Sequence, residues 1–455
     1  MFARSAVLSL VSSIIVSRAA GLQLDVTSQD SIKDTAKSLA SSIVSAYIED
    51  LKEQSIPGLF SEEDYYFWES GAVLGGLIDY YHLTSDSQYN ALISEGLQWQ
   101  LGESNAFMPA NQTRNMGNDD QSFWGLAAMT AAEAKLSKPQ NGEWVDFAAN
   151  VFDVQAARLQ IEEGTNGTCG GGLRWQIFSF NSGYSYKDTM SNGNFFLLAA
   201  RLAKYTGNAT YSEWAEKSYN WAKDVGIVSN DYSVYAGASA EEECQDLNHI
   251  QWSAYHGTYT EGAAVMYNLT NGGSNWTDTV KGLVNSSSVF LENDVLVEVA
   301  CEEKGTCDTD QRAFKGIAAR SYARAAVAAP FVAESVNKQL EASAKGAARA
   351  CDGSDEAIQC SLSWADEDSK WETASAKDGN LGEVFGALAV VQGLLYKSSK
   401  PVATSNGTTS GSTSNNATQS TGTGAAAPAN TGSAGRVATS LITVLIMAVV
   451  AVLSC

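Results

Sequence analysis

The chain has 455 residues, with 51 acidic against 29 basic side chains, a formal net charge of −22 and an isoelectric point near 4.5. This charge excludes nucleic acid as a partner, because phosphate backbones are bound by basic surfaces. It suits a protein that works outside the cell in an acidic setting.

The first twenty residues have the pattern of a secretory signal peptide. Arg4 precedes an apolar run over 6–16, and small residues lead up to an expected cleavage after Ala20. The alternative is a membrane anchor, which is disfavoured because the apolar run is too short to cross a bilayer. We therefore expect residues 1–20 to be removed.

Residues 21–397 are predicted to form one all-α domain. Proline is scarce there, and apolar residues recur at spacings of three and four. Twelve helices are expected, at Ser31–Gln54, Tyr66–Leu83, Ser85–Leu101, Asp119–Leu136, Trp144–Leu159, Asp188–Thr206, Ala209–Val225, Tyr259–Leu269, Trp276–Leu291, Gln311–Ala328, Phe331–Ala350 and Gly382–Tyr396.

The predicted helices fall into pairs that alternate in character. An apolar member carrying glycine is followed by a more polar one, as in Tyr66–Leu83 and Ser85–Leu101. Glycine inside a helix costs roughly 1 kcal/mol relative to alanine, so its recurrence indicates close helix packing. Alternating inner and outer helices predict an (α/α)6 barrel, a six-hairpin toroid; an irregular bundle or a solenoid is the alternative.

Two acids stand side by side at the start of the fourth predicted helix, in the sequence Asn118-Asp119-Asp120-Gln121. Acids here can cap a helix and complement its dipole. A carboxyl pair beside aromatic residues can also protonate and attack a sugar acetal. The two interpretations are compatible, because a cap can hold a carboxylate in place.

Aromatic and polar residues cluster at several predicted helix starts and in the segments before them. Aromatic rings can stack on sugar rings, and amide or cationic groups can hydrogen-bond hydroxyls. Any one cluster alone indicates core or loop packing, but several together predict a shared cleft. The candidate substrate-binding residues are Tyr66, Trp68, Asn118, Gln121, Trp124, Arg174, Trp175, Lys187, Asn192, Tyr255, His256 and Tyr259.

No cofactor or metal is expected. Gly170–Gly172 lacks the following Lys-Ser/Thr of a phosphate-binding loop. No Cys-x-x-Cys motif occurs, and the three histidines are not at zinc-ligand spacing with the cysteines.

Six cysteines precede Cys455, an even number that indicates disulfides in an oxidising compartment. Fifteen connectivities are possible. Short spacing favours Cys301–Cys307 and Cys351–Cys360, which leaves Cys169–Cys244.

Eight Asn-x-Ser/Thr sequons make several surface glycans expected. They lie at Asn111, Asn166, Asn208, Asn268, Asn275, Asn285, Asn406 and Asn416.

The C-terminal part has the composition of a tether. Residues 398–430 are rich in Ser, Thr, Gly and Ala and predict a flexible stalk. Small residues, a short spacer and the uncharged apolar run 437–455 match a glycosylphosphatidylinositol (GPI) signal. We expect residues 431–455 to be removed and Asn430 to carry the anchor, with Gly432 and Ser433 as alternatives; a transmembrane helix is disfavoured.

The acid-pair segment, followed by Phe123-Trp124-Gly125, resembles the motif of glycoside hydrolase family 76, the endo-α-1,6-mannanases. Further segments resemble the family in the same order over roughly 24–396: Gly171-Gly172 with Trp175, Tyr186-Lys187-Asp188-Thr189, Ser191-Asn192-Gly193, Gly257-Thr258-Tyr259, Phe314-Lys315-Gly316 and Leu381-Gly382-Glu383. With its two terminal signals, the chain resembles the fungal GPI-anchored cell-wall branch of that family.

The resemblance implies an (α/α)6 barrel and a retaining mechanism, with Asp119 as nucleophile and Asp120 as general acid/base. It also implies a donor that is α-mannan or a GPI glycan, hydrolysis or transfer to a β-glucan acceptor, and a place at the outer membrane face or in the cell wall. A monomer is expected. The alternative function is a non-catalytic wall scaffold that binds mannan.

Overall fold

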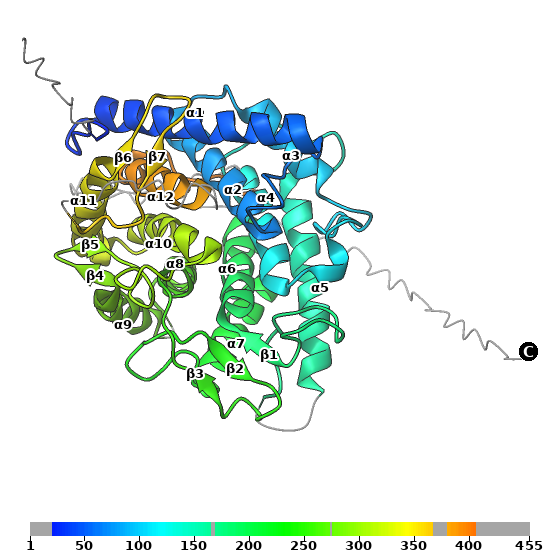
Figure 1. Cartoon of the computed structure of the whole chain (residues 1–455). Coiled ribbons are helices and arrows are strands. Elements are labelled where there is room, and N and C mark those ends of the chain that lie inside the picture. The colour runs from blue at the N-terminus through cyan, green and yellow to red at the C-terminus, as the bar shows by residue number, and fades with distance from the viewer. Residues whose placement is uncertain (1–20, 165–168, 274, 367–379, 406–455) are drawn as a thin grey trace, which may run out of the picture. The chain divides into compact units, whose positions relative to one another are not determined.

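Twelve α-helices make up most of the part of the chain that the structure describes, as predicted (Figure 1). Their bounds are α1 Gln29–Gln54, α2 Phe67–Thr84, α3 Asn90–Trp99, α4 Asn118–Glu133, α5 Trp144–Glu163, α6 Thr189–Thr206, α7 Ala209–Asp224, α8 Ser253–Leu269, α9 Trp276–Ser286, α10 Thr309–Ala328, α11 Ala333–Arg349 and α12 Leu381–Gly393. This computed structural model describes residues 21–164, 169–273, 275–366 and 380–405. In those ranges no helix is long and apolar enough to span a membrane.

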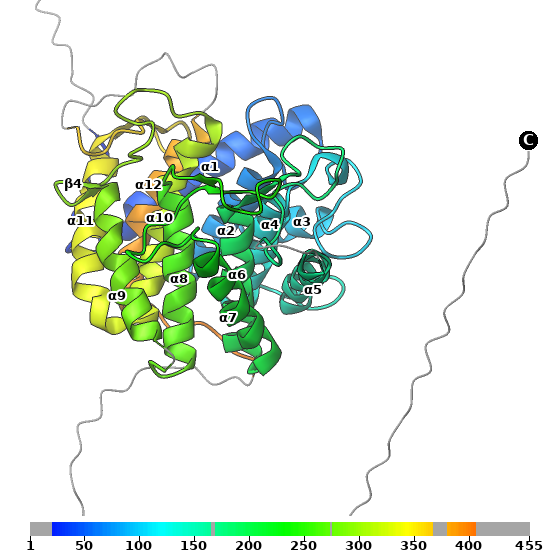
Figure 2. The same cartoon turned by 90° about the horizontal axis from the view of Figure 1, so that it is seen from below.

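The even-numbered helices form an inner ring. Each packs on the next in the order α2, α4, α6, α8, α10 and α12, and α12 packs back on α2. Each inner helix also packs on at least one outer helix; α12 packs on α11 and on α1, which runs along the edge of the barrel in Figure 1. Figure 2 shows the axes of α6, α8, α9 and α11 running in nearly the same direction. The predicted (α/α)6 barrel is confirmed.

Glycines let the inner helices approach closely, as their recurrence predicted. A Cβ on Gly316 would lie 2.8 Å from Gly386 Cα, where α10 meets α12. A Cβ on Gly257 would lie 2.8 Å from Ala318 Cα, where α8 meets α10. Gly257 lies inside α8, because this helix begins at Ser253 rather than at the predicted Tyr259.

Short strands and three disulfides connect the helices. Tyr186–Asp188 (β1) pairs antiparallel with Gly237–Ser239 (β2), which pairs with Leu247–Asn248 (β3). The hairpins Leu291–Glu292 with Val295–Leu296 (β4, β5) and Cys351–Asp352 with Gln359–Cys360 (β6, β7) complete the strands of the described residues. The disulfides are Cys169–Cys244, Cys301–Cys307 and Cys351–Cys360, so the predicted pairing is confirmed.

A buried ionic network ties the inner helices together toward their C-terminal ends. Arg324 Nη2 lies 2.6 Å from Asp79 Oδ1, and its Nη1 lies 3.1 Å from Glu133 Oε2. Arg201 Nη2 lies 2.8 Å from the same Glu133 oxygen. Arg324 thus joins α10 to α2 and α4.

The folded unit extends past Lys397, where the stalk was predicted to begin. Ala403 N donates to Glu133 O at 2.9 Å, and Ser405 N donates to Tyr205 O at 2.9 Å. Residues up to Ser405 are therefore bound to the C-terminal ends of α4 and α6. The rest of the expected stalk, the expected signal peptide, Asn430 and residues 431–455 lie outside the described residues.

Five of the sequon asparagines lie in the described ranges. Asn111, Asn208, Asn275 and Asn285 are exposed, whereas Asn268 is partly buried. Asn268 Nδ2, the atom that would carry a glycan, donates to Ala328 O at 3.2 Å. Asn166, Asn406 and Asn416 lie outside the described residues.

Candidate active site

Acidic residues gather where the inner helices begin. Except for α8, each inner helix carries a carboxyl at its N-cap or in its first turn: Glu69, Asp119 with Asp120, Asp188, Asp310 and Glu383. The first main-chain N–H groups of a helix form the positive end of its dipole and stabilise nearby anions. The start of the barrel can therefore hold several carboxyls that burial would otherwise disfavour.

Asp119 is fixed against the segment that precedes β1. Its Oδ2 accepts a hydrogen bond from Trp175 Nε1 at 3.1 Å, and its Oδ1 is buried without a partner. Asn118 N donates to Trp175 O at 2.8 Å, and Ile177 N donates to Met116 O at 3.4 Å. The backbone before α4 is thus bound to the backbone that carries Trp175.

Asp120 caps its own helix. Its Oδ2 accepts a hydrogen bond from Gly117 N at 2.7 Å. The predicted capping role is confirmed for this residue. Asp119 and Asp120 are both partly exposed at the start of α4.

Burial raises the pKa of both carboxyls. Desolvation raises the pKa of Asp120 to about 7, although the main-chain groups of Gly117 and Trp68 act in the opposite direction. Desolvation also raises the pKa of Asp119 well above its ordinary value, and the charges of Asp120 and Asp188 raise it further. The pair therefore retains a proton close to neutral pH. The unpartnered Asp119 Oδ1 and the raised pKa of Asp119 favour that proton on Asp119.

Trp68 and Asp310 lie on the Asp120 side of the pair. Trp68 Nε1 donates to Asp310 Oδ1 at 2.9 Å, and the Trp68 and Phe123 ring centroids are 4.7 Å apart. Tyr66, which precedes α2, is 58% exposed. The negative charge of Asp310 is the largest cause that raises the Tyr66 pKa, so the two residues are neighbours.

Asp188 and Tyr255 complete the surroundings of the pair. Asp188 Oδ2 accepts from Ser191 N at 2.9 Å, while its Oδ1 is buried without a partner. Burial raises the Asp188 pKa to about 6. Burial raises the Tyr255 pKa, and the charges of Asp188 and Asp119 raise it further. The Tyr255 hydroxyl therefore lies close to both acids.

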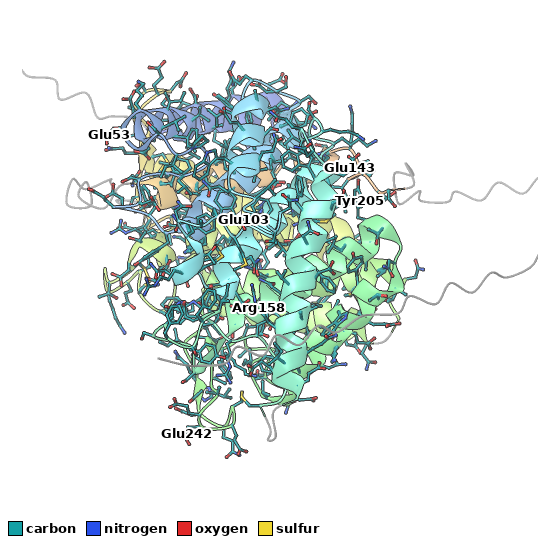
Figure 3. The ribbon with its side chains drawn as sticks, turned by 90° about the vertical axis from the view of Figure 1, so that its right-hand side faces the viewer. Glu53, Glu103, Glu143, Arg158, Tyr205 and Glu242 are labelled. Atoms are coloured by element: carbon teal, nitrogen blue, oxygen red, sulfur yellow. A yellow bond between two sulfur atoms is a disulfide. The ribbon has the colours of Figure 1, made fainter. Side chains whose placement is uncertain are left out.

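Two predicted substrate-binding amides act inside the protein instead. Arg158 on α5 (Figure 3) donates from Nη1 to Asn118 Oδ1 at 2.7 Å and to Gln121 Oε1 at 2.6 Å. Asn118 Nδ2 donates to Arg174 O, and Gln121 Nε2 donates to Ala106 O. Both amides therefore fix the backbone around the acid pair.

A second group of predicted residues holds the segment that leads to Trp175. Lys187 is buried, donates to Cys169 O at 2.7 Å and pairs with Glu162 Oε2 at 3.1 Å. Arg174 Nε pairs with Glu162 Oε1 at 2.8 Å. Asn192 Oδ1 accepts from Leu173 N at 2.7 Å. These side chains bond to the segment itself and to Glu162, not to the acid pair.

Three predicted residues lie in the core. Trp124 is fully buried beneath the pair, and its Nε1 donates to Phe67 O at 3.1 Å. His256 bonds Tyr322 Oη and Ser286 Oγ, each at 2.9 Å, and burial lowers its pKa to about 3. Tyr259 is also fully buried. These rings cannot reach a ligand at the surface of the site.

Sequence reasoning missed Asp188, Asp310 and Arg158 as parts of the site. Asp188 and Asp310 each stand where an apolar predicted helix begins, the same signal that singled out Asp119. Arg158 gave no local signal, because it lies on an outer helix. No group of three or more His, Cys, Asp or Glu within the described ranges is arranged as metal ligands.

Comparison with known proteins gives the family. The model of glycosyl hydrolase family 76 matches residues 31–406. The mannan endo-1,6-alpha-mannosidase DFG5 of Saccharomyces cerevisiae is 38% identical over 381 residues, which cover 82% of this chain and 80% of the relative. The DCW1 mannosidase of Eremothecium gossypii is 38% identical over 401 residues, covering 86% and 84%.

Solved structures show the same architecture. Dfg5 of Chaetomium thermophilum, determined in complex with glucosamine, superposes with a TM-score of 0.77 at 36% identity and covers 84% of this chain and 94% of that one. An α-1,6-mannanase of Salegentibacter sp. HEL1_6 superposes with a TM-score of 0.62 at 18% identity, covering 80% and 99%; it is an inactive variant with two consecutive aspartates replaced by asparagine, in complex with α-1,6-mannotriose. By sequence and fold alike, the chain belongs to glycoside hydrolase family 76.

Proposed function

We propose that this protein is a retaining α-1,6-mannosidase or transglycosidase of the fungal cell surface that acts on α-mannan or on the mannose of GPI glycans. The observation that carries the proposal is the adjacent Asp119–Asp120 pair, buried enough to retain a proton near neutral pH. The DFG5 and DCW1 relatives are named mannan endo-1,6-alpha-mannosidases. The inactive mannanase variant lacks two consecutive aspartates, which supports a pair as the centre of the chemistry.

The proposed reaction has two steps. In the first, an Asp119 carboxylate oxygen bonds to C1 of mannose while the C1–O bond breaks, and Asp120 gives its proton to the departing oxygen. In the second, Asp120 takes a proton from water or from a sugar hydroxyl, whose oxygen bonds to C1 and releases Asp119. Water gives hydrolysis, and a hydroxyl of a β-glucan acceptor gives transfer.

The surroundings of Asp119 favour the proton on that residue before substrate binds, which is the reverse of these roles. We propose that substrate reverses the preference. Positive charge develops on C1 in the oxocarbenium-like transition state, and a carboxylate beside it is stabilised in its ionised form. The proton then remains on Asp120, as a general acid requires.

Exposed and partly exposed aromatic rings beside the pair are the proposed sugar contacts. They are Trp175 beside Asp119, Tyr66 on the other side, and Tyr255 near Asp188. The remaining predicted binding residues support these positions from within the protein.

We propose a secreted monomer tethered through a GPI anchor at Asn430, with no cofactor. The sequence signals at both ends support this placement. Three disulfides in the described residues support an oxidising compartment.

The two carboxyls can be tested separately with Asp119→Asn and Asp120→Asn on an aryl α-mannoside with a good leaving group. Such a leaving group needs no proton, so Asp120→Asn should keep the first step, and azide should restore turnover by replacing the activated acceptor. Asp119→Asn should remain inactive with azide. Full activity of both variants on α-1,6-mannan would refute the site.

The alternative function, a mannan-binding scaffold without catalysis, makes a different prediction. The wild-type protein would then bind α-1,6-mannosides without changing their mass. Incubation of the secreted protein with a defined α-1,6-mannoside and a β-glucan acceptor, followed by mass analysis of the products, separates hydrolysis, transfer and binding alone.

A further inference from the structure

Two aromatic residues, Phe178 and Phe180, follow Trp175 closely in the chain. The Phe178 and Phe180 rings are stacked, with centroids 5.4 Å apart and an angle of 7° between their planes. Phe180 is 65% exposed. The Arg114 guanidinium carbon lies 5.8 Å from the centre of the Phe180 ring. We call Arg114, Phe178 and Phe180 the aromatic shelf.

The shelf is bound to the same backbone as the catalytic pair. The backbone of 116–118 pairs with that of 175–177 through a bridge between Gly117 and Gln176. Asn181 Nδ2 donates to Arg114 O at 3.0 Å and joins the two arms of the shelf. The shelf is therefore held in place relative to Asp119, on the side where Trp175 contacts that residue.

Exposure of these rings contributes nothing to the stability of the fold. Apolar area is stabilising when it leaves water, and most of the Phe180 ring remains in water. The exposed part of the Phe180 ring presents apolar surface, and the neighbouring Arg114 guanidinium supplies several hydrogen-bond donors. A sugar ring offers the matching surface, with an apolar face and hydroxyl oxygens at its edge.

We infer that the aromatic shelf is a subsite for a neutral hexose chain, where it binds a sugar of the substrate that is remote from the bond being broken. This inference rests on the proposed function and deepens it. A subsite at this place would make the affinity of the site depend on chain length. It would favour long glycans over single mannosides without changing the chemical step.

The test uses a protein variant that binds glycans without turning them over. In an Asp119→Asn/Asp120→Asn background, the Kd of α-1,6-manno-oligosaccharides of increasing length is measured by titration calorimetry. The background protein should show a step in affinity at the length that reaches the shelf. Phe180→Ala should remove that step, raising Kd about tenfold for the long chains only, because one apolar ring face is then no longer covered.

Two further variants control for general effects. Phe180→Trp keeps a flat aromatic face and should keep the step. Phe331→Ala removes another exposed ring that lies beside a cation and a second aromatic ring, and it should leave every Kd unchanged. Phe331 precedes α11, is 41% exposed, and lies 5.8 Å from Lys281 Nζ and 4.9 Å from the Tyr267 ring.

The outcomes separate the inference from the proposed function. Chain-length dependence that is identical in Phe180→Ala and the background would overturn the shelf alone, as would an equal loss at every length. Absence of binding at every length would overturn the proposed substrate and the shelf together.

Discussion

Gly117→Ala should disable the acid pair with little effect on the fold. Gly117 has φ −85° and ψ 166°, a conformation that alanine adopts without strain. The added Cβ would lie only 2.1 Å from Asp119 Oδ1, whereas contacts below 3.0 Å are essentially never seen. The Asp119 oxygen must therefore move by about 0.9 Å, which is easier than moving the backbone, since it ends a flexible side chain.

A shift of this size is large for catalysis and small for stability. Misplacement of a catalytic group by about 1 Å can cost about 100-fold in rate, so we expect a loss of that order in kcat/KM on an α-1,6-manno-oligosaccharide. Alanine is a poorer N-cap than glycine, so about 1 kcal/mol of stability is lost at most. Steady-state kinetics and thermal unfolding of the same preparation measure the two effects.

Gly164→Ala is the matched control. Gly164 ends α5 with φ −73°, and its Cβ would meet only Ile161 O at 3.4 Å, an ordinary contact. Its activity should equal that of the wild type. Unchanged kcat/KM in Gly117→Ala, or a loss of activity fully explained by unfolding, would refute the argument.

Three further predictions concern charge, covalent links and the ionic network. Burial and the charges of Asp120 and Asp188 raise the pKa of Asp119 well above its ordinary value, so the pair loses its last proton only on the alkaline side, and kcat/KM should fall there as pH rises. Asp188→Asn removes one of these negative charges and should move the fall to lower pH; a fall that stays in place would exclude the coupling. A disulfide that closes a longer loop restricts the unfolded chain more, so replacing both cysteines of Cys169–Cys244, separated by 75 residues, with serine should lower the free energy of unfolding by about 4.5 kcal/mol. The same change at Cys301–Cys307, separated by 6, should lower it by about 2 kcal/mol. Equal losses in denaturant unfolding would contradict this entropic explanation. Arg324→Met removes one partner from each of two buried carboxylates and should lower the free energy of unfolding by about 3–5 kcal/mol. The kcat of the folded protein should stay near the wild-type value, because the network lies away from the acid pair. An unchanged melting temperature would argue against a stabilising role of the network.

Helix periodicity predicted the twelve helices, and their alternation favoured the barrel over an irregular bundle or a solenoid. The alternation of glycine-bearing and polar helices gave the inner and outer rings, because close packing in the inner ring requires small residues. Boundaries were less certain where a helix lacks a side-chain cap. The predicted start of α8 at Tyr259 was wrong because Gly257, a potential end signal, serves helix contact instead.

The sequence predicted where the acids lie but not which neighbours face them. Trp124 follows Asp120 by four residues, so it lies about one helical turn deeper, inside the barrel. Asp310 reaches Trp68 from 242 positions away, a contact that only the closed ring of helices creates. Lys187 and His256 carry polar groups typical of binding sites, yet buried partners within the protein satisfy them.

The central claim, that Asp119 forms a covalent bond to mannose while Asp120 handles the proton, is tested most directly by trapping the intermediate. An activated α-mannoside with a fluorine substituent that slows its release should label the wild-type protein, and peptide mass spectrometry then locates the added sugar. We predict one label, on Asp119, and none in Asp119→Asn. A label on Asp120 would reverse the two roles, and a label on neither residue, with turnover intact, would contradict the account.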